Sequence, residues 1–158
     1  MISHEITLRS AESTDLERLL TFAYDSPGAP QWTRQTWQRV LGSAGSRAQR
    51  FILVAESAGE FVGFGVLGLA GDTAELESLA VRTAWRRRGI ARRLCHELFA
   101  WARTRGISQI SLEVRVSNVA AHALYKSLGF QVAGLRRAYY RDPEEDALVM
   151  TRALQQSS

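Results

Sequence analysis

The residues best suited to bind an anion form one short run from Arg86 to Ala91 (RRRGIA), between an expected strand and an expected helix. A helix N-terminus presents free backbone N–H groups at the positive end of the helix dipole, and both favour a bound phosphate. Gly89 lets an anion approach the main chain closely because it has no side chain. The arginines add Coulomb attraction and can form bidentate contacts with phosphate. The run therefore predicts a phosphate-binding loop, and the alternative is a solvated basic loop that caps the helix.

Two other patterns look like functional motifs but favour a structural interpretation. Residues 63–68 spell G-x-G-x-x-G, yet they lie inside an apolar run and open no helix, as a dinucleotide-binding loop must. We expect them to mark a strand that is closely packed or bulged. The three histidines show no metal-ligand spacing with Cys95 or with carboxylates, so we expect no metal site. Cys95 lies among leucines and is expected to be buried and unreactive.

The elements that position these residues follow from the hydrophobic period. Strands are predicted at residues 5–9, 51–55, 61–69, 74–81, 107–116, 130–139 and 147–154. Helices are predicted at residues 13–24, 33–41, 89–105 and 117–128, with loops over residues 25–31 and 42–49. The order β-α-α-β-β-β-α-β-α-β-β predicts an α/β (α+β) fold. We expect a mixed central sheet of about seven strands with helices on both faces.

Length and composition are those of a single soluble domain spanning residues 1–158. The chain has 46% apolar and 23% charged residues, and no apolar run approaches the about 18 residues that a membrane span needs. The first residues, MISHEITLRS, lack the basic and apolar regions of a signal peptide. One cysteine cannot form an internal disulfide. We therefore expect a cytoplasmic protein with no membrane partner.

Positive charge is concentrated in one region of the chain. The formal net charge is +4, but residues 82–105 contain eight arginines against Glu97 as the only acidic residue. A local basic patch on a balanced chain predicts a specific anionic ligand. A nucleic-acid-binding module is the alternative, and it needs aromatic side chains that stack on bases. Only Trp85, Phe99 and Trp101 lie there, and Trp101 falls on the apolar helix face, so nucleic acid is not an expected partner.

The run Leu79-Ala80-Val81, followed by the loop of residues 86–91, resembles the acetyl-CoA signature of the GNAT N-acetyltransferases, R/Q-x-x-G-x-G/A. The order of strands and helices is similar to that fold over nearly the whole chain. In that family the strand residues pair with the pantetheine arm, a role that falls on Leu79, Ala80 and Val81. The loop amides hold the pyrophosphate, which implies acetyl-CoA as cosubstrate and no metal. The remaining coenzyme residues that this resemblance implies are Arg87, Arg88, Gly89, Ile90, Ala91, Arg92 and Asn118.

A narrower resemblance lies further along the chain. Residues 112–115 (LEVR), 136–140 (RRAYY) and 145–147 (EDA) are similar to the ribosomal-protein-alanine N-acetyltransferase subfamily, which acetylates the N-terminal amine of a ribosomal protein. That resemblance implies a protein N-terminus as acceptor, which attacks the thioester directly. The aromatic residues that it assigns to the peptide site, and that could otherwise be core residues, are Trp32, Tyr139 and Tyr140.

The same resemblance implies the proton-transfer groups. Glu113, on the polar face of its strand, would be the general base through water, and Tyr125 the general acid that protonates the leaving thiolate. A peptide α-amine has a pKa of about 8 and is partly neutral, so the base need not be strong. The alternatives are a Glu113 paired with an arginine such as Arg115, and a half-buried Tyr125 without a catalytic role. Glu77 is a rival base on the strand before the phosphate loop.

The expected function is therefore acetyl-CoA-dependent acetylation of a protein N-terminus. A GNAT enzyme that acetylates a small-molecule amine or a lysine side chain is the alternative. A coenzyme-binding sensor without catalysis is a third class, which the presence of both Glu113 and Tyr125 disfavours.

Overall fold

The computed structural model describes residues 5–26, 32–42 and 50–154. The strands are β1 (Thr7–Ser10), β2 (Arg50–Ser57), β3 (Glu60–Ala70), β4 (Thr73–Val81), β5 (Gln109–Arg115), β6 (Gln131–Tyr140) and β7 (Glu145–Ala153). The helices are α1 (Leu16–Tyr24), α2 (Arg34–Gly42), α3 (Ile90–Thr104) and α4 (Val119–Ser127), with short 3₁₀ helices at Ser13–Asp15 and Thr83–Trp85. Most of the two expected loops, residues 27–31 and 43–49, lies outside the described residues.

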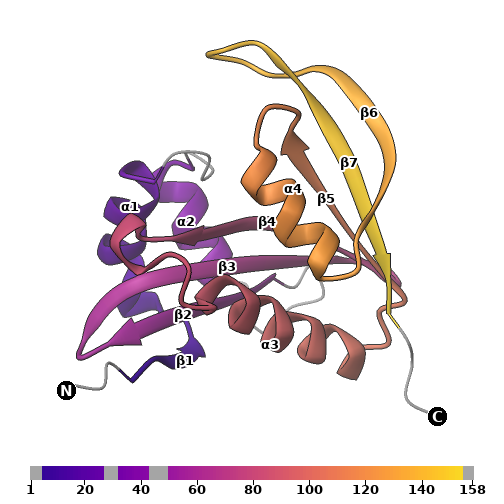
Figure 1. The fold of residues 1–158 in the computed structure, drawn as a ribbon. Coiled ribbons are helices and arrows are strands. Elements are labelled where there is room, and N and C mark those ends of the chain that lie inside the picture. The colour runs from indigo at the N-terminus through magenta and orange to yellow at the C-terminus, as the bar shows by residue number, and fades with distance from the viewer. Residues whose placement is uncertain (1–4, 27–31, 43–49, 155–158) are drawn as a thin grey trace.

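The strands form one seven-stranded sheet in the order β1-β2-β3-β4-β5-β7-β6. Neighbouring strands are antiparallel except β4 and β5, which are parallel and are joined through α3. One core packs α3 against one face of the sheet together with residues of α4, and a second core packs α1 and α2 against the other face (Figure 1). The predicted mixed sheet with helices on both faces is confirmed.

The parallel pair β4–β5 is short, and this opens the middle of the sheet. Pairing runs only from Thr73↔Gln109 to Glu75↔Ser111. Beyond these residues the two strands diverge, as Figure 1 shows. Among the described strands, none pairs with β4 on that side from Leu76 to Val81. The opening therefore leaves this side of β4 without a neighbouring strand among the described residues, and an extended ligand could pair with the backbone there.

Glycines of the G-x-G-x-x-G run lie in β3 and let α3 approach the sheet. A Cβ on Gly65 would lie 2.8 Å from Cδ1 of the fully buried Leu98, and one on Gly63 would lie 3.0 Å from the carbonyl oxygen of Ala80. The expected close packing is thus confirmed. Cys95, on the inner face of α3, is fully buried, and this burial raises the pKa of its thiol to about 12, as expected for an unreactive cysteine.

Gly65→Ala tests the packing of α3 on β3. The added methyl group has no room beside Leu98, so we expect the free energy of unfolding to fall by about 1–3 kcal/mol. Gly42→Ala at the end of α2 is the control, because a Cβ there meets nothing within 4 Å. Urea denaturation should show that this control is unchanged or slightly more stable. Equal stability of Gly65→Ala and the wild type would contradict the packing.

No helix within the described residues is long and apolar enough to span a membrane.

Candidate active site

Two glutamates meet where β4 and β5 diverge. Glu75 is the last β4 residue paired with β5, and Glu113 lies two residues beyond its partner Ser111. Leu76 and Leu112, their neighbours in sequence, are buried in the core beneath α3. Because side chains alternate along a strand, both glutamates point to the opposite face of the sheet. There the carboxyl groups of Glu75 and Glu113 lie close enough to interact with each other.

This carboxyl pair is electrostatically strained. Burial raises the pKa of Glu75 to about 7, and the hydrogen bond and charge of Glu113 add to that effect. Two carboxylates in contact repel each other when both are ionised, so the pair holds one proton in the neutral range. The Nε atom of Arg136 lies 3.4 Å from Oε1 of Glu113. Arg136 therefore supplies positive charge on the Glu113 side of the pair.

Two tyrosines from the end of β6 lie beside this pair. The rings of Tyr139 and Tyr140 are nearly perpendicular, with centroids 5.0 Å apart. Burial is the main cause that raises the phenol pKa of Tyr139, followed by the charges of Glu113 and Glu75. Burial, then Tyr139, then Glu113 raise the pKa of Tyr140 to about 12. The structure therefore brings together three of the predicted site residues and adds Glu75.

Tyr125 lies on α4, on the face of the sheet that α3 covers and opposite to Glu113. Its ring packs edge-on against Phe130 with centroids 5.8 Å apart, and it lies against the core beneath α3. Burial raises the pKa of the Tyr125 phenol well above its ordinary range, and nearby Cys95 and Tyr140 add to the shift. The hydroxyl therefore stays protonated throughout the neutral range. Glu113 and Tyr125 therefore lie on opposite faces of the sheet.

Glu77, the rival base, is already bound by a cation. The Nε and Nη2 atoms of Arg50 donate to its two carboxylate oxygens at 2.7 and 3.1 Å. Trp32 lies beside this ion pair, 5.8 Å from the Arg50 guanidinium, and packs against Trp37 with ring centroids 4.8 Å apart. The three predicted peptide-site residues therefore lie in two places. Trp32 lies next to Glu77, whereas Tyr139 and Tyr140 lie next to Glu113.

The expected phosphate loop leads directly into α3. Gly89 is the N-cap residue with φ +78°, and no side chain caps this helix end. Arg87 also has a left-handed backbone, with φ +63°, and is exposed together with Arg88. The first backbone N–H groups of α3 are therefore available to an anion. The left-handed backbone at Arg87 and Gly89 turns the chain from the end of β4 into α3.

Three other predicted coenzyme residues have structural contacts. Arg92 donates from Nη2 to Oγ of Ser127 at 2.7 Å and so ties α3 to α4. The side-chain oxygen of Asn118 accepts from the backbone N–H of Ala121 at 3.1 Å and caps α4. Ile90 is buried beneath the first turn of α3. These contacts hold the two helices on one side of the opening.

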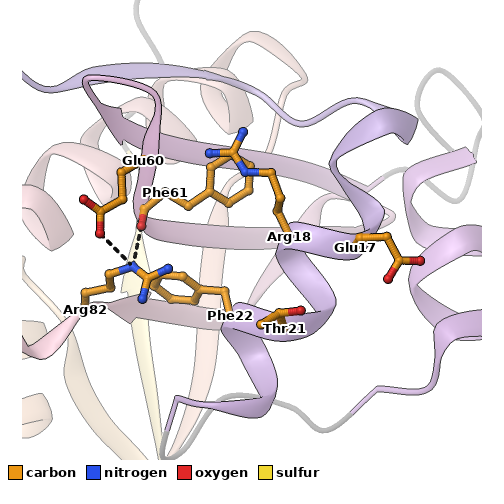
Figure 2. Close-up of a pocket in the computed structure, with 7 residues that line it drawn as sticks. All are labelled: Glu17, Arg18, Thr21, Phe22, Glu60, Phe61 and Arg82. Atoms are coloured by element: carbon orange, nitrogen blue, oxygen red, sulfur yellow. Dashed lines mark hydrogen bonds and ion pairs between the residues drawn. The ribbon is translucent and has the colours of Figure 1, made fainter.

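A pocket of about 380 Å³ lies where β4 leads into the phosphate loop (Figure 2). Its lining residues are Glu17, Arg18, Thr21, Phe22, Glu60, Phe61 and Arg82. Arg82 donates to the carbonyl oxygen of Phe61 at 2.5 Å, and its guanidinium lies 4.8 Å from the ring centroid of Phe22. Arg18 lies 3.7 Å over the Phe61 ring. The pocket contains none of the predicted site residues, and its arginines hold α1 and β3 to the start of the loop.

A model of the acetyltransferase (GNAT) family matches residues 13–130. The chain belongs to this family and is an acetyltransferase. It is 36% identical over 146 residues to the [ribosomal protein bS18]-alanine N-acetyltransferase of Escherichia coli K12, covering 91% of this chain and 95% of that protein. It is 40% identical over 129 residues to the N-alpha-acetyltransferase RimI of Mycobacterium tuberculosis, covering 79% and 77%.

Solved structures show the same fold. The crystal structure of the Escherichia coli ribosomal-protein-S18-alanine N-acetyltransferase superposes with a TM-score of 0.83 at 32% identity, covering 98% of this chain and 97% of that one. The PaiA N-acetyltransferase of Thermoplasma acidophilum, solved in complex with coenzyme A, has a TM-score of 0.80 at 20% identity, covering 95% and 99%. The predicted family and fold are therefore confirmed.

Proposed function

We propose that this acetyltransferase transfers the acetyl group of acetyl-CoA to the N-terminal α-amine of a ribosomal protein. The observation that carries the proposal is that Glu113 lies where the pairing of β4 and β5 ends, and that Tyr125 lies on the opposite face of the sheet. A thioester held in that opening would have a base on one side and an acid on the other. The identity to bS18-alanine N-acetyltransferases over most of the chain supports the ribosomal acceptor.

The coenzyme would follow the free side of β4 towards α3. Leu79, Ala80 and Val81 lie on the stretch of β4 that has no β5 partner, so their backbone groups are suited to pair with the pantetheine arm. The loop from Arg87 to Arg92 would hold the pyrophosphate through the uncapped N–H groups of α3. The backbone N–H near Val81 could also polarise the thioester carbonyl.

The transfer requires three movements of protons and bonds. The acceptor ammonium first gives a proton to the Glu113 carboxylate, directly or through water, and becomes a neutral amine. The amine nitrogen then attacks the thioester carbon, so that a C–N bond forms and the C–S bond breaks. Tyr125 donates its proton to the departing thiolate and regains one from the nitrogen as the amide forms. Glu113 is the better base because Arg50 engages both carboxylate oxygens of Glu77.

The acceptor is tested with ribosomal protein bS18 of the same organism. We expect tandem mass spectrometry, after incubation with the enzyme and acetyl-CoA, to locate the new acetyl group on the N-terminal nitrogen. A bS18 sample with a chemically blocked N-terminus is the control and should gain no acetyl group. Acetylation confined to lysine side chains would contradict the proposed acceptor and leave the enzyme class intact.

The phosphate loop predicts a salt-dependent affinity for acetyl-CoA. Exposed arginines attract the coenzyme through solvent, so the affinity should fall roughly threefold to tenfold between low salt and about 0.5 M NaCl. Arg87→Asn is the matched variant, because asparagine tolerates the left-handed backbone found at this position. Isothermal titration calorimetry should show weaker binding and a shallower salt dependence for this variant. An affinity that does not change with salt would argue against a role of the arginines.

A further inference from the structure

We infer that the base is a pair of carboxyl groups and not a single one: Glu75 shares one proton with Glu113, and the two groups accept the proton of the acceptor ammonium as a unit. Glu75 acts through Glu113 and is a positioning residue in this scheme. The inference rests on the proposed function for the role of Glu113 as base.

The backbone brings the two groups together. Glu75 ends the paired stretch of β4, and β5 continues past it from Ser111 to Glu113 on the same face of the sheet. The strands diverge from this point, so the two side chains stand at the edge of the opening where the thioester would lie. Glu113 has only 13% of its side chain exposed, and Glu75 is half-buried. Water therefore screens their mutual repulsion poorly.

The groups that surround the pair decide where its charge lies. Glu77 adds negative charge from the same strand, whereas Arg136 on β6 supplies positive charge at 3.4 Å from Glu113. Tyr139 and Tyr140 face the pair from β6, and both stay neutral because their phenol pKa values are raised. One cation beside two carboxyl groups favours a pair with a single negative charge at neutral pH.

Sharing a proton adapts the base to its substrate. A lone glutamate has a pKa of about 4.3 and an α-ammonium of about 8, so proton transfer between them is strongly uphill. Burial and then Glu113 raise the pKa of Glu75 to about 7, which brings it near that of the α-ammonium. When the pair has lost its shared proton, an N–H bond of the ammonium breaks and an O–H bond forms on an oxygen of one carboxyl group, which then donates a hydrogen bond to the other carboxylate. After product release the proton leaves to solvent.

A spectroscopic titration tests the pair without an acceptor. In infrared difference spectra of the wild-type enzyme, we expect the C=O band of a protonated carboxyl group at pH 6, and its loss with a midpoint near pH 7. Glu75→Gln should abolish that band, and Glu113→Gln should move its midpoint down by about one pH unit or more. Glu77→Gln is the control: it removes a charge that raises the pKa of Glu75 less than Glu113 does, so it should keep the band and lower its midpoint by less than Glu113→Gln does.

Steady-state kinetics then show whether the two groups work as a unit. Glu113→Gln should lower kcat about 10²-fold or more, and Glu75→Gln about tenfold. The double variant should be no slower than Glu113→Gln by more than about twofold, because groups that act together are not additive. Acetyl-CoA affinity, measured by calorimetry, should stay unchanged in all three variants.

Three results would overturn the inference. They are a wild-type enzyme without a protonated carboxyl group at pH 6, a midpoint that Glu113→Gln leaves unchanged, and losses in kcat that multiply in the double variant. The first of these results is measured on the wild-type enzyme. It can therefore contradict the inference even if one of the variants does not fold. A failure to acetylate bS18 would contradict only the proposed acceptor, because the titration contains no acceptor.

Discussion

Gly89→Glu is expected to abolish measurable binding of acetyl-CoA. Gly89 is the N-cap of α3, and open space surrounds the position that a side chain would occupy. A glutamate carboxylate there would stand where the pyrophosphate is proposed to bind, and two like charges in contact cost several kcal/mol. We expect the affinity measured by isothermal titration calorimetry to fall at least about 10²-fold.

Gly106→Glu separates this electrostatic effect from backbone strain. Gly106 follows the other end of α3 with φ +74°, close to the φ of +78° at Gly89, and it is also surrounded by open space. Both substitutions therefore carry a similar left-handed backbone cost of about 1–2 kcal/mol. The control should bind acetyl-CoA within about threefold of the wild type. Equal binding by Gly89→Glu and Gly106→Glu would remove the phosphate-loop assignment.

Tyr125→Phe is expected to reduce kcat by about 10²-fold to 10³-fold while acetyl-CoA binds almost as before. The change removes the hydroxyl that is proposed to protonate the thiolate and keeps the ring that packs edge-on against Phe130. Burial raises the pKa of this phenol, so Tyr125 is neutral at neutral pH. The substitution therefore removes a neutral hydroxyl group and changes no charge. Stopped-flow or steady-state release of coenzyme A, together with calorimetry, measures the two effects separately.

The exposed Tyr24 at the end of α1 provides the matched control. Tyr24→Phe makes the same chemical change outside the proposed site and should leave kcat at the wild-type value. Parallel losses in kcat and in acetyl-CoA affinity for Tyr125→Phe would assign Tyr125 to coenzyme binding. An unchanged kcat would remove it from the mechanism.

The hydrophobic period predicts the elements well because each strand and helix buries one face locally. The strand of residues 74–81 and the helix from residue 89 are both present with nearly the expected bounds. The order of strands in the sheet is less accessible, because β7 inserts between β5 and β6 through contacts that are distant in sequence. The end of β4–β5 pairing at Glu75 also depends on tertiary contacts and not on any local pattern.

Residue patterns alone do not predict which glutamate of β4 belongs to the candidate site. Glu75 and Glu77 both stand in the alternating strand before the loop, and the sequence alone does not tell them apart. The fold separates them, because Arg50 neutralises Glu77 and Glu113 contacts Glu75. The parallel crossover from β4 to β5 is the signal in the sequence that could have predicted the contact between Glu75 and Glu113. It pairs the first residues of β4 with the first residues of β5. Asn118 and Arg92 also have helix-positioning contacts that the coenzyme motif does not reveal.

Release of coenzyme A with two matched peptides tests the proposed function most directly. One peptide has a free N-terminal alanine and no lysine, and the other has a blocked N-terminus and one internal lysine. We predict release from acetyl-CoA with the first peptide and none above background with the second. Release with the second peptide alone would contradict N-terminal acetylation and identify the enzyme as a side-chain acetyltransferase.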